Sequence, residues 1–80
     1  MRVLWTDPAA DTFRRLSGQV REAVLSRIKM ISEFPEMHPV RRHEPYAGLR
    51  FFLVEPYCIS YAFAEDTIIV LAIFPARRGN

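Results

Sequence analysis

Among the residue types of this chain, arginine is the one whose number and chemistry most clearly suggest a function. Of the 11 Lys and Arg side chains, all but Lys29 are arginine. The planar guanidinium group forms paired, charge-assisted hydrogen bonds with phosphate and carboxylate groups. The bias favours a nucleic-acid ligand, although coding composition also enriches arginine. Since the net charge is only +2, the position of each arginine matters more than their number.

Two short arginine-containing runs stand out. Arg41, Arg42 and His43 follow one another in a proline-rich segment, and Arg77 and Arg78 follow an apolar run near the end of the chain. A phosphate-rich target would attract both runs. The alternative is that both are simply solvated, since loops and chain ends are often polar. The residues alone leave this choice open.

The sequence lacks the motifs of the common enzyme and metal-binding classes. It has no glycine-rich phosphate loop, no HExxH motif and no nucleophile elbow. The single cysteine, Cys58, excludes an intrachain disulfide and a cysteine-based metal site, and is interpreted as a small buried apolar residue. His38 has no other ligands at metal spacing and is interpreted as a loop residue. We therefore predict neither a metal nor a cofactor.

The length of 80 residues predicts one domain, residues 1–80, with a modest core. Half of the residues are hydrophobic and a quarter are charged, which is typical of globular proteins. The longest apolar run, residues 68–76, is less than half as long as a membrane-spanning helix requires. The N-terminus also lacks the apolar stretch of a signal peptide. These features predict a soluble, cytoplasmic protein with no membrane association.

The N-terminal part of the chain predicts one strand and two helices. Residues 2–6 form a short β-branched and aromatic run, which predicts an edge or second strand. Asp7 followed by Pro8 predicts a helix start, because the carboxylate accepts from free first-turn amides and proline loses no hydrogen bond there. Apolar residues then recur at helical spacing on both sides of a Ser-Gly interruption. Phe34 and Pro35 are predicted to end the second helix.

The C-terminal part predicts a sheet. Residues 35–48 are too rich in proline for regular structure and predict a long functional loop. Strand-like runs follow at residues 49–55, 57–64 and 67–74, separated by intervals short enough only for hairpins. The sequence therefore predicts an α+β fold of order β-α-α-β-β-β, with two N-terminal helices packed on a mostly antiparallel sheet.

The last predicted strand is apolar at both odd and even positions, and strict alternation places Ile73 and Val70 on opposite faces. Two helices cover only one face of a sheet, so a partner chain is expected to cover the other. The aromatic stripe of the preceding strand is interpreted as core rather than as a base-stacking platform. The predicted core comprises Phe13, Leu16, Val24, Ile28, Ile31, Ile59, Leu71 and Ile73.

Three short phrases, weak singly, carry a family resemblance together: WTDPAA at residues 5–10, YAGLR at residues 46–50 and YCISY at residues 57–61. They resemble the WT-x-x-A opening, the x-x-GLR entry to the second strand and the Y-x-I-x-Y third strand of the RelE/ParE superfamily, bacterial toxins of type II toxin–antitoxin systems. Arg77 and Arg78 are similar to the arginine pair that commonly follows the last strand of that superfamily. Pro75 stands where many relatives have histidine. The resemblance covers nearly the whole chain.

The resemblance implies a toxin that causes growth arrest and is neutralised by a cognate antitoxin. Relatives that cleave mRNA in the ribosomal A site make the 2′-hydroxyl attack the adjacent phosphate. Arg50 is similar to an arginine that these relatives use at the scissile phosphate, and Arg77 is expected to reach the same surface. Arginine stabilises an oxyanion well, but its pKa above about 12 makes it a poor proton carrier.

The nearest pair of residues with pKa values suited to proton transfer is His43 and Glu44, with Tyr46 and Tyr61 as slower alternatives. On this interpretation the partners are the ribosome and mRNA, and no metal or cofactor is needed. The candidate catalytic residues are Arg50, Arg77, Glu44 and His43, and the candidate nucleic-acid or target-binding residues are Arg41, Arg42 and Arg78.

A second interpretation follows the ParE branch of the superfamily, whose members poison DNA gyrase by protein contact and need no catalytic groups. Pro75 in place of the family histidine favours it. Arg50 would then be a surface residue paired with Glu44 or Glu55. A third interpretation is an inactive homologue that retains only the fold and the binding of antitoxin. The sequence does not decide among these three.

Overall fold

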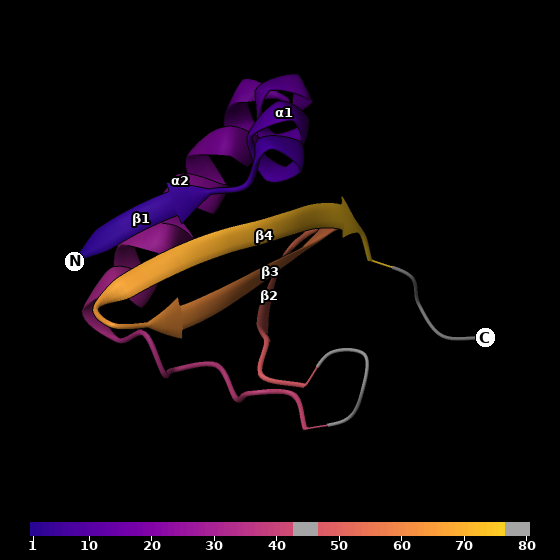
Figure 1. The fold of residues 1–80 in the computed structure, drawn as a ribbon. Helices are drawn as coiled ribbons and strands as arrows, with labels where there is room; N and C mark the ends of the chain where they lie inside the picture. Colours follow the sequence, from indigo (N-terminus) through magenta and orange to yellow (C-terminus); the bar gives the residue numbers. More distant parts are fainter. Residues whose placement is uncertain (43–46, 77–80) are drawn as a thin grey trace.

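A computed structural model describes residues 1–42 and 47–76 of the chain (Figure 1). Its elements are β1 (Arg2–Trp5), α1 (Asp7–Arg15), α2 (Gly18–Glu33), β2 (Arg50–Val54), β3 (Tyr57–Ala64) and β4 (Thr67–Pro75). The order is β-α-α-β-β-β, so the α+β fold predicted from the sequence is confirmed. No helix in the described ranges is long and apolar enough to cross a membrane.

The four strands form one sheet in the order β1-β4-β3-β2. β1 pairs with β4 in parallel, whereas β2 with β3 and β3 with β4 are antiparallel. The prediction of a mostly antiparallel sheet is therefore confirmed, and β1 is an edge strand. In Figure 1, α2 passes behind the strands, and the segment that follows it runs below them toward the start of β2.

A β-bulge interrupts β4. Leu71 lies as an added residue between the partners of Ser60 and Tyr61. Because one added residue reverses the alternation of side chains, Ile73 shares a face with Val70, and both are buried. Strict alternation predicts these two residues on opposite faces, and the bulge makes that prediction wrong.

Thr6 caps α1, so the helix cap lies one residue before the Asp7 predicted from the sequence. Its hydroxyl oxygen accepts a hydrogen bond from the amide of Ala9 at 3.2 Å and donates one to the carbonyl oxygen of Leu71 at 2.7 Å. Asp7 and Pro8 occupy the first turn, where a carboxylate is favourable and the missing amide of proline costs nothing. One hydroxyl thus joins the end of β1, the start of α1 and the bulge of β4.

The second helix begins and ends at signals that are visible in the sequence. The Ser17 hydroxyl caps α2 by accepting from the amide of Val20 at 3.3 Å. Phe34 is the C-terminal cap and Pro35 follows it, which confirms the predicted end of the helix. The joint between α1 and α2 is short, because α1 ends at Arg15 and α2 begins at Gly18. The two helices can cover only one face of the sheet.

The core lies between the helices and the sheet. Of the predicted core residues, Phe13 and Leu71 are only partly buried, and the others are buried. The aromatic stripe of β3 belongs to the core or packs against it, as predicted. Among the described residues, the buried apolar set is Ala9, Leu16, Val24, Ile28, Ile31, Phe52, Ile59, Tyr61, Ile68, Val70 and Ile73.

The chain between α2 and β2 is anchored where it approaches the sheet. Val40 forms an isolated antiparallel bridge with Arg50. The amide of Arg41 donates to the carbonyl of Leu49 at 2.7 Å, and the amide of Gly48 donates to the carbonyl of Arg41 at 2.8 Å. Gly48 has φ 85°, a conformation that glycine adopts at little cost. These bonds hold Arg41 beside the first residues of β2.

Candidate functional site

The sheet face opposite the helices, here called the outer face, is apolar and exposed where β2, β3 and β4 meet. Leu53 pairs with Cys58, and Cys58 pairs with Phe74, so the three form a row across the strands. Leu53 is 50% exposed and Phe74 is 37% exposed. The ring of Phe51 lies edge-on to that of Phe74, with the centroids 6.3 Å apart. A contiguous apolar surface of this kind is typical of a protein-contact site.

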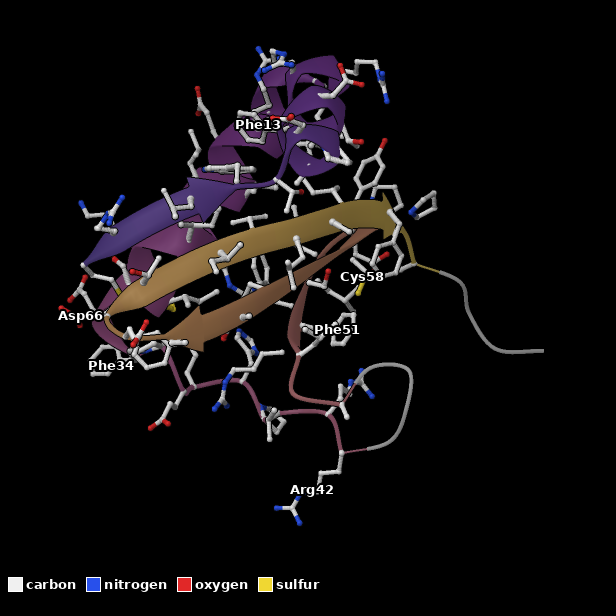
Figure 2. The ribbon with its side chains drawn as sticks, in the orientation of Figure 1. Phe13, Phe34, Arg42, Phe51, Cys58 and Asp66 are labelled. Carbon is white, nitrogen blue, oxygen red and sulfur yellow. The ribbon has the colours of Figure 1, made fainter. Side chains whose placement is uncertain are left out.

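Arg41 stands at the border of this apolar surface. Its guanidinium carbon lies 4.9 Å from the centroid of the Phe51 ring, a cation–π contact. Arg41, Phe51, Leu53, Cys58 and Phe74 line one open cavity, and Figure 2 shows Phe51 and Cys58 side by side on neighbouring strands. The small Cys58 side chain helps to line this cavity, here called the hollow. Arg27, His38 and Glu55 also line the hollow, so the site combines apolar side chains with two cations, a histidine and an acid.

Cys58 is not activated as a nucleophile. Burial raises the pKa of its thiol above the usual range, and the nearby Arg41 offsets this only in part. The thiol is therefore protonated near neutral pH, whereas the thiolate is the reactive form. This agrees with the interpretation of Cys58 as a small apolar side chain.

The side chain of Arg50 lies on the helix side of the sheet, at the start of β2. It pairs with Tyr61, whose side chain is buried in the core. Its Nη1 donates to the carbonyl oxygen of His38 at 2.6 Å, and its Nη2 lies 3.7 Å from a carboxylate oxygen of Glu36. The Arg50 side chain is 17% exposed, whereas that of Glu36 is 74% exposed. In this structure Arg50 fastens residues 36–38 to the sheet, and its phosphate-binding role remains a prediction.

Arg27 and His38 form a contact that the sequence analysis missed. Nη2 of Arg27 lies 3.0 Å from Nε2 of His38, and the guanidinium stands 5.3 Å from the centroid of the Phe52 ring. The His38 ring stacks on the same Phe52 ring at 6.0 Å. Burial, and after it the charge of Arg27, lower the pKa of His38. The sequence did contain a signal for this contact. Arg27 follows the buried Val24 by three residues, so helical spacing places it on the core-facing stripe of α2.

Tyr61 is fully buried, and its hydroxyl donates to the carbonyl oxygen of Pro35 at 3.2 Å. Burial raises the pKa of the phenol, and Arg50 and Arg27 partly oppose the shift. The hydroxyl therefore keeps its proton near neutral pH. Its evident role is to hold the start of the segment that follows α2.

The structure places only some of the sequence-predicted site residues. Arg41 and Arg42 are exposed, and Figure 2 shows Arg42 projecting away from the body of the protein. Arg41 borders the outer face, whereas Arg50 is turned to the helix side. The remaining predicted site residues, His43, Glu44, Arg77 and Arg78, lie outside the described residues. Within the described ranges, no group of three His, Cys, Asp or Glu side chains could hold a metal ion.

Replacement of Arg50 by alanine is expected to lower the free energy of unfolding by about 1.5–3 kcal/mol, because a largely buried hydrogen bond from a charged donor is lost. The carbonyl of His38 and the carboxylate of Glu36 would both lose their partner. Urea unfolding followed by circular dichroism measures the change. The matched control is Arg42→Ala at an exposed arginine, which should change stability by less than about 0.5 kcal/mol. Equal losses for the two variants would contradict the fastening role of Arg50.

Comparison with known proteins identifies the family. A family profile described as "ParE toxin of type II toxin-antitoxin system, parDE" matches residues 3–79. The chain therefore belongs to the ParE toxin family of type II toxin–antitoxin systems, and the RelE/ParE resemblance seen in the sequence is confirmed. No curated protein sequence matches the chain.

Solved structures of similar fold come from both branches of the superfamily. The intact RelBE toxin–antitoxin complex of E. coli contains a chain of TM-score 0.81 and 16% identity, with 96% of this chain and 98% of that chain covered. For the RelBE2 complex of Mycobacterium tuberculosis the TM-score is 0.79 at 20% identity, and the match covers 94% of this chain and 96% of that chain. For the chromosomal ParDE system of P. aeruginosa the TM-score is 0.66 at 21% identity, and the match covers 96% of this chain and 97% of that chain. At these identities the similarity shows the fold.

Proposed function

We propose that this ParE-family toxin arrests growth by contact with a protein target, DNA gyrase, and not by cleaving RNA. The observation that carries the proposal is the outer face. Leu53 and Phe74 are exposed there beside Phe51, which matches the apolar centre of a protein-contact site. Arg41 at its border supplies a cation for an acidic group of the target. RNA cleavage would require Arg50 at the phosphate, but its guanidinium is already bonded to the carbonyl oxygen of His38 and lies near the carboxylate of Glu36.

A cognate antitoxin is the second proposed partner. The solved RelBE and ParDE structures described above are of toxin–antitoxin complexes or systems. The antitoxin of this chain is expected to cover apolar surface that the two helices leave open, with acidic residues near Arg41. Co-expression with such an antitoxin should therefore relieve growth arrest and yield a complex that purifies intact.

The second candidate function is ribosome-dependent cleavage of mRNA. The observation in its favour is the exposed Arg41 stacked on Phe51, because a cation beside an aromatic ring suits both a phosphate and a base. In this proposal Arg50 and Arg77 bind the scissile phosphate, while His43 and Glu44 transfer protons. Arg42 and Arg78 would contact flanking phosphates.

Induction of the protein in bacteria, with parallel mapping of DNA breaks and transcript ends, separates these functions. Gyrase poisoning predicts DNA breaks and an SOS response, with transcript ends unchanged. Cuts at preferred codons without DNA breaks would instead support the mRNA function. Normal growth of cells that contain folded, antitoxin-binding protein would identify an inactive homologue and contradict both proposals.

A further inference from the structure

We propose that His38 is a proton-sensitive latch. In its neutral form it helps to hold residues 35–42, here called the strap, against α2 and β2, and its protonation removes one of these bonds and loosens the strap at His38. The strap carries Arg41, which borders the hollow of the outer face. His38 lines the same cavity, so its protonation and the loosening of the strap there would alter one wall of the proposed target-binding site. The latch itself stands on contacts of the described residues and does not depend on the proposed function.

Three side chains of the protein body fasten the strap, each from a different element. Tyr61 of β3 donates to the carbonyl of Pro35 at 3.2 Å, and Arg50 of β2 donates to the carbonyl of His38 at 2.6 Å. Arg27 of α2 approaches Nε2 of His38 at 3.0 Å. The first two bonds end on backbone carbonyl oxygens, which do not titrate. The third ends on an imidazole nitrogen, the one acceptor of the three that protonates near neutral pH.

The chemistry of the Arg27 contact determines the protonation state of His38. A guanidinium group has only hydrogen-bond donors and is charged at all relevant pH values. The hydrogen bond at 3.0 Å therefore requires Nε2 of His38 to be the unprotonated acceptor, which places the proton of the neutral ring on Nδ1. A second proton would sit on Nε2 and oppose an N–H of Arg27. Protonation thus removes the bond and adds a cation beside another cation.

The charges around His38 favour the neutral ring. Arg27 faces it from α2 and Arg50 from β2, while Tyr61 of β3 keeps its proton, as shown above. The strap itself contributes the cation Arg41 in the shared cavity and one acid, Glu36, whose side chain is 74% exposed and lies 3.7 Å from Arg50. A second acid, Glu55, follows β2, is exposed and lines the same cavity. An exposed carboxylate is screened by water, so it offsets the cations only weakly. The described surroundings therefore oppose a positive charge on His38.

The direction of the pH effect follows from linkage. In the fastened strap the pKa of His38 is lowered by burial and by Arg27, whereas a released, solvated histidine has the ordinary value of 6.5. The released form therefore binds more protons as the pH falls below 6.5. The stabilisation from neutral His38 is complete above that pH and declines as the pH drops toward the lowered pKa. Acid favours loosening of the strap at His38.

Nitrogen-15 NMR of the full chain between pH 7.5 and pH 5 tests the latch. At neutral pH, the His38 ring should show the tautomer protonated on Nδ1. As the ring titrates below its ordinary pKa, the backbone amides of residues 36–41, apart from Pro39, which has none, should shift along the same curve. The amides of Met37 and Arg41 donate to the carbonyls of Phe34 and Leu49. Their hydrogen exchange, corrected for intrinsic pH dependence, should become about tenfold less protected, the scale of losing one hydrogen bond.

Two glutamine variants provide matched controls. His38→Gln keeps an oxygen that can accept from Arg27 but does not titrate, so protection of the strap should persist and lose its pH dependence. His43→Gln removes the other histidine of the chain and should leave the titration of residues 36–41 unchanged. A His38 ring protonated on Nε2 at neutral pH would overturn the proposal even if the variants failed to fold. So would equal pH dependence of strap protection in the wild type and in His38→Gln. None of these readouts uses toxicity, so they separate the latch from the proposed function.

Discussion

Replacing Leu53 and Phe74 together by glutamate is expected to abolish growth arrest while the protein remains folded. Both side chains are exposed on the outer face, at 50% and 37%. Burial of such a side chain at an interface contributes about 1.5–3 kcal/mol, and about 1.4 kcal/mol corresponds to tenfold in affinity. Each single substitution should therefore weaken target binding about ten- to hundredfold, and a buried glutamate adds a desolvation cost. Plating efficiency after induction measures the effect.

The control for this prediction is Leu25→Glu. Leu25 is 49% exposed, like Leu53, but it lies on α2 and not on the sheet. This variant should remain toxic at similar cellular abundance. Loss of the contact between Phe51 and Phe74 should cost the Phe74→Glu variant about 1 kcal/mol of stability, so thermal unfolding must accompany the growth assay. A folded double variant that still arrests growth would exclude the outer face as the target-binding site.

Ile59→Ala is expected to destabilise the protein strongly. Ile59 is fully buried on β3, between Phe52 of β2 and Ile73 of β4. Truncation of a buried isoleucine costs about 2–5 kcal/mol, because contacts are lost and a cavity remains. A domain of this length has a free energy of unfolding of about 4–12 kcal/mol. The variant should therefore be markedly destabilised in urea, and its toxicity should fall with its abundance.

Ile69→Ala is the matched control for this core substitution. Ile69 lies on β4, pairs with Leu4 and Ala62, and is only half-buried. The same truncation there removes less buried apolar area and should cost about 1 kcal/mol. If both alanine variants had similar unfolding midpoints, the core would not lie between the helices and the sheet as described.

The fold was predictable because its signals are local. Pro35 marks the end of α2, and the short intervals between the last three runs permit only hairpins. The bulge at Leu71 was not predictable, since its residues are as apolar as those of a regular strand. It depends instead on contacts distant in sequence, including the bond from Thr6 to the carbonyl of Leu71. A local pattern cannot indicate such a contact.

The candidate site was predictable only in part. The sequence showed an apolar last strand that two helices could not cover on both faces, and the exposed Phe74 on the outer face agrees with this. It did not show which way Arg50 turns, because that depends on the carbonyl of His38 on another segment. His38 had no partner at metal spacing in the sequence, and its actual partner is Arg27, 11 positions away on α2. Partners of this kind are fixed by tertiary packing.

An assay with purified DNA gyrase tests the proposed target without the complications of a growing cell. Supercoiling of relaxed plasmid is followed with the wild-type protein and with the variant carrying Leu53→Glu and Phe74→Glu. We expect the wild type to inhibit supercoiling or to trap cleaved DNA, and the folded variant to do neither. Undiminished supercoiling in the presence of folded wild-type protein, with the same preparation cutting ribosome-bound mRNA, would contradict the proposed target.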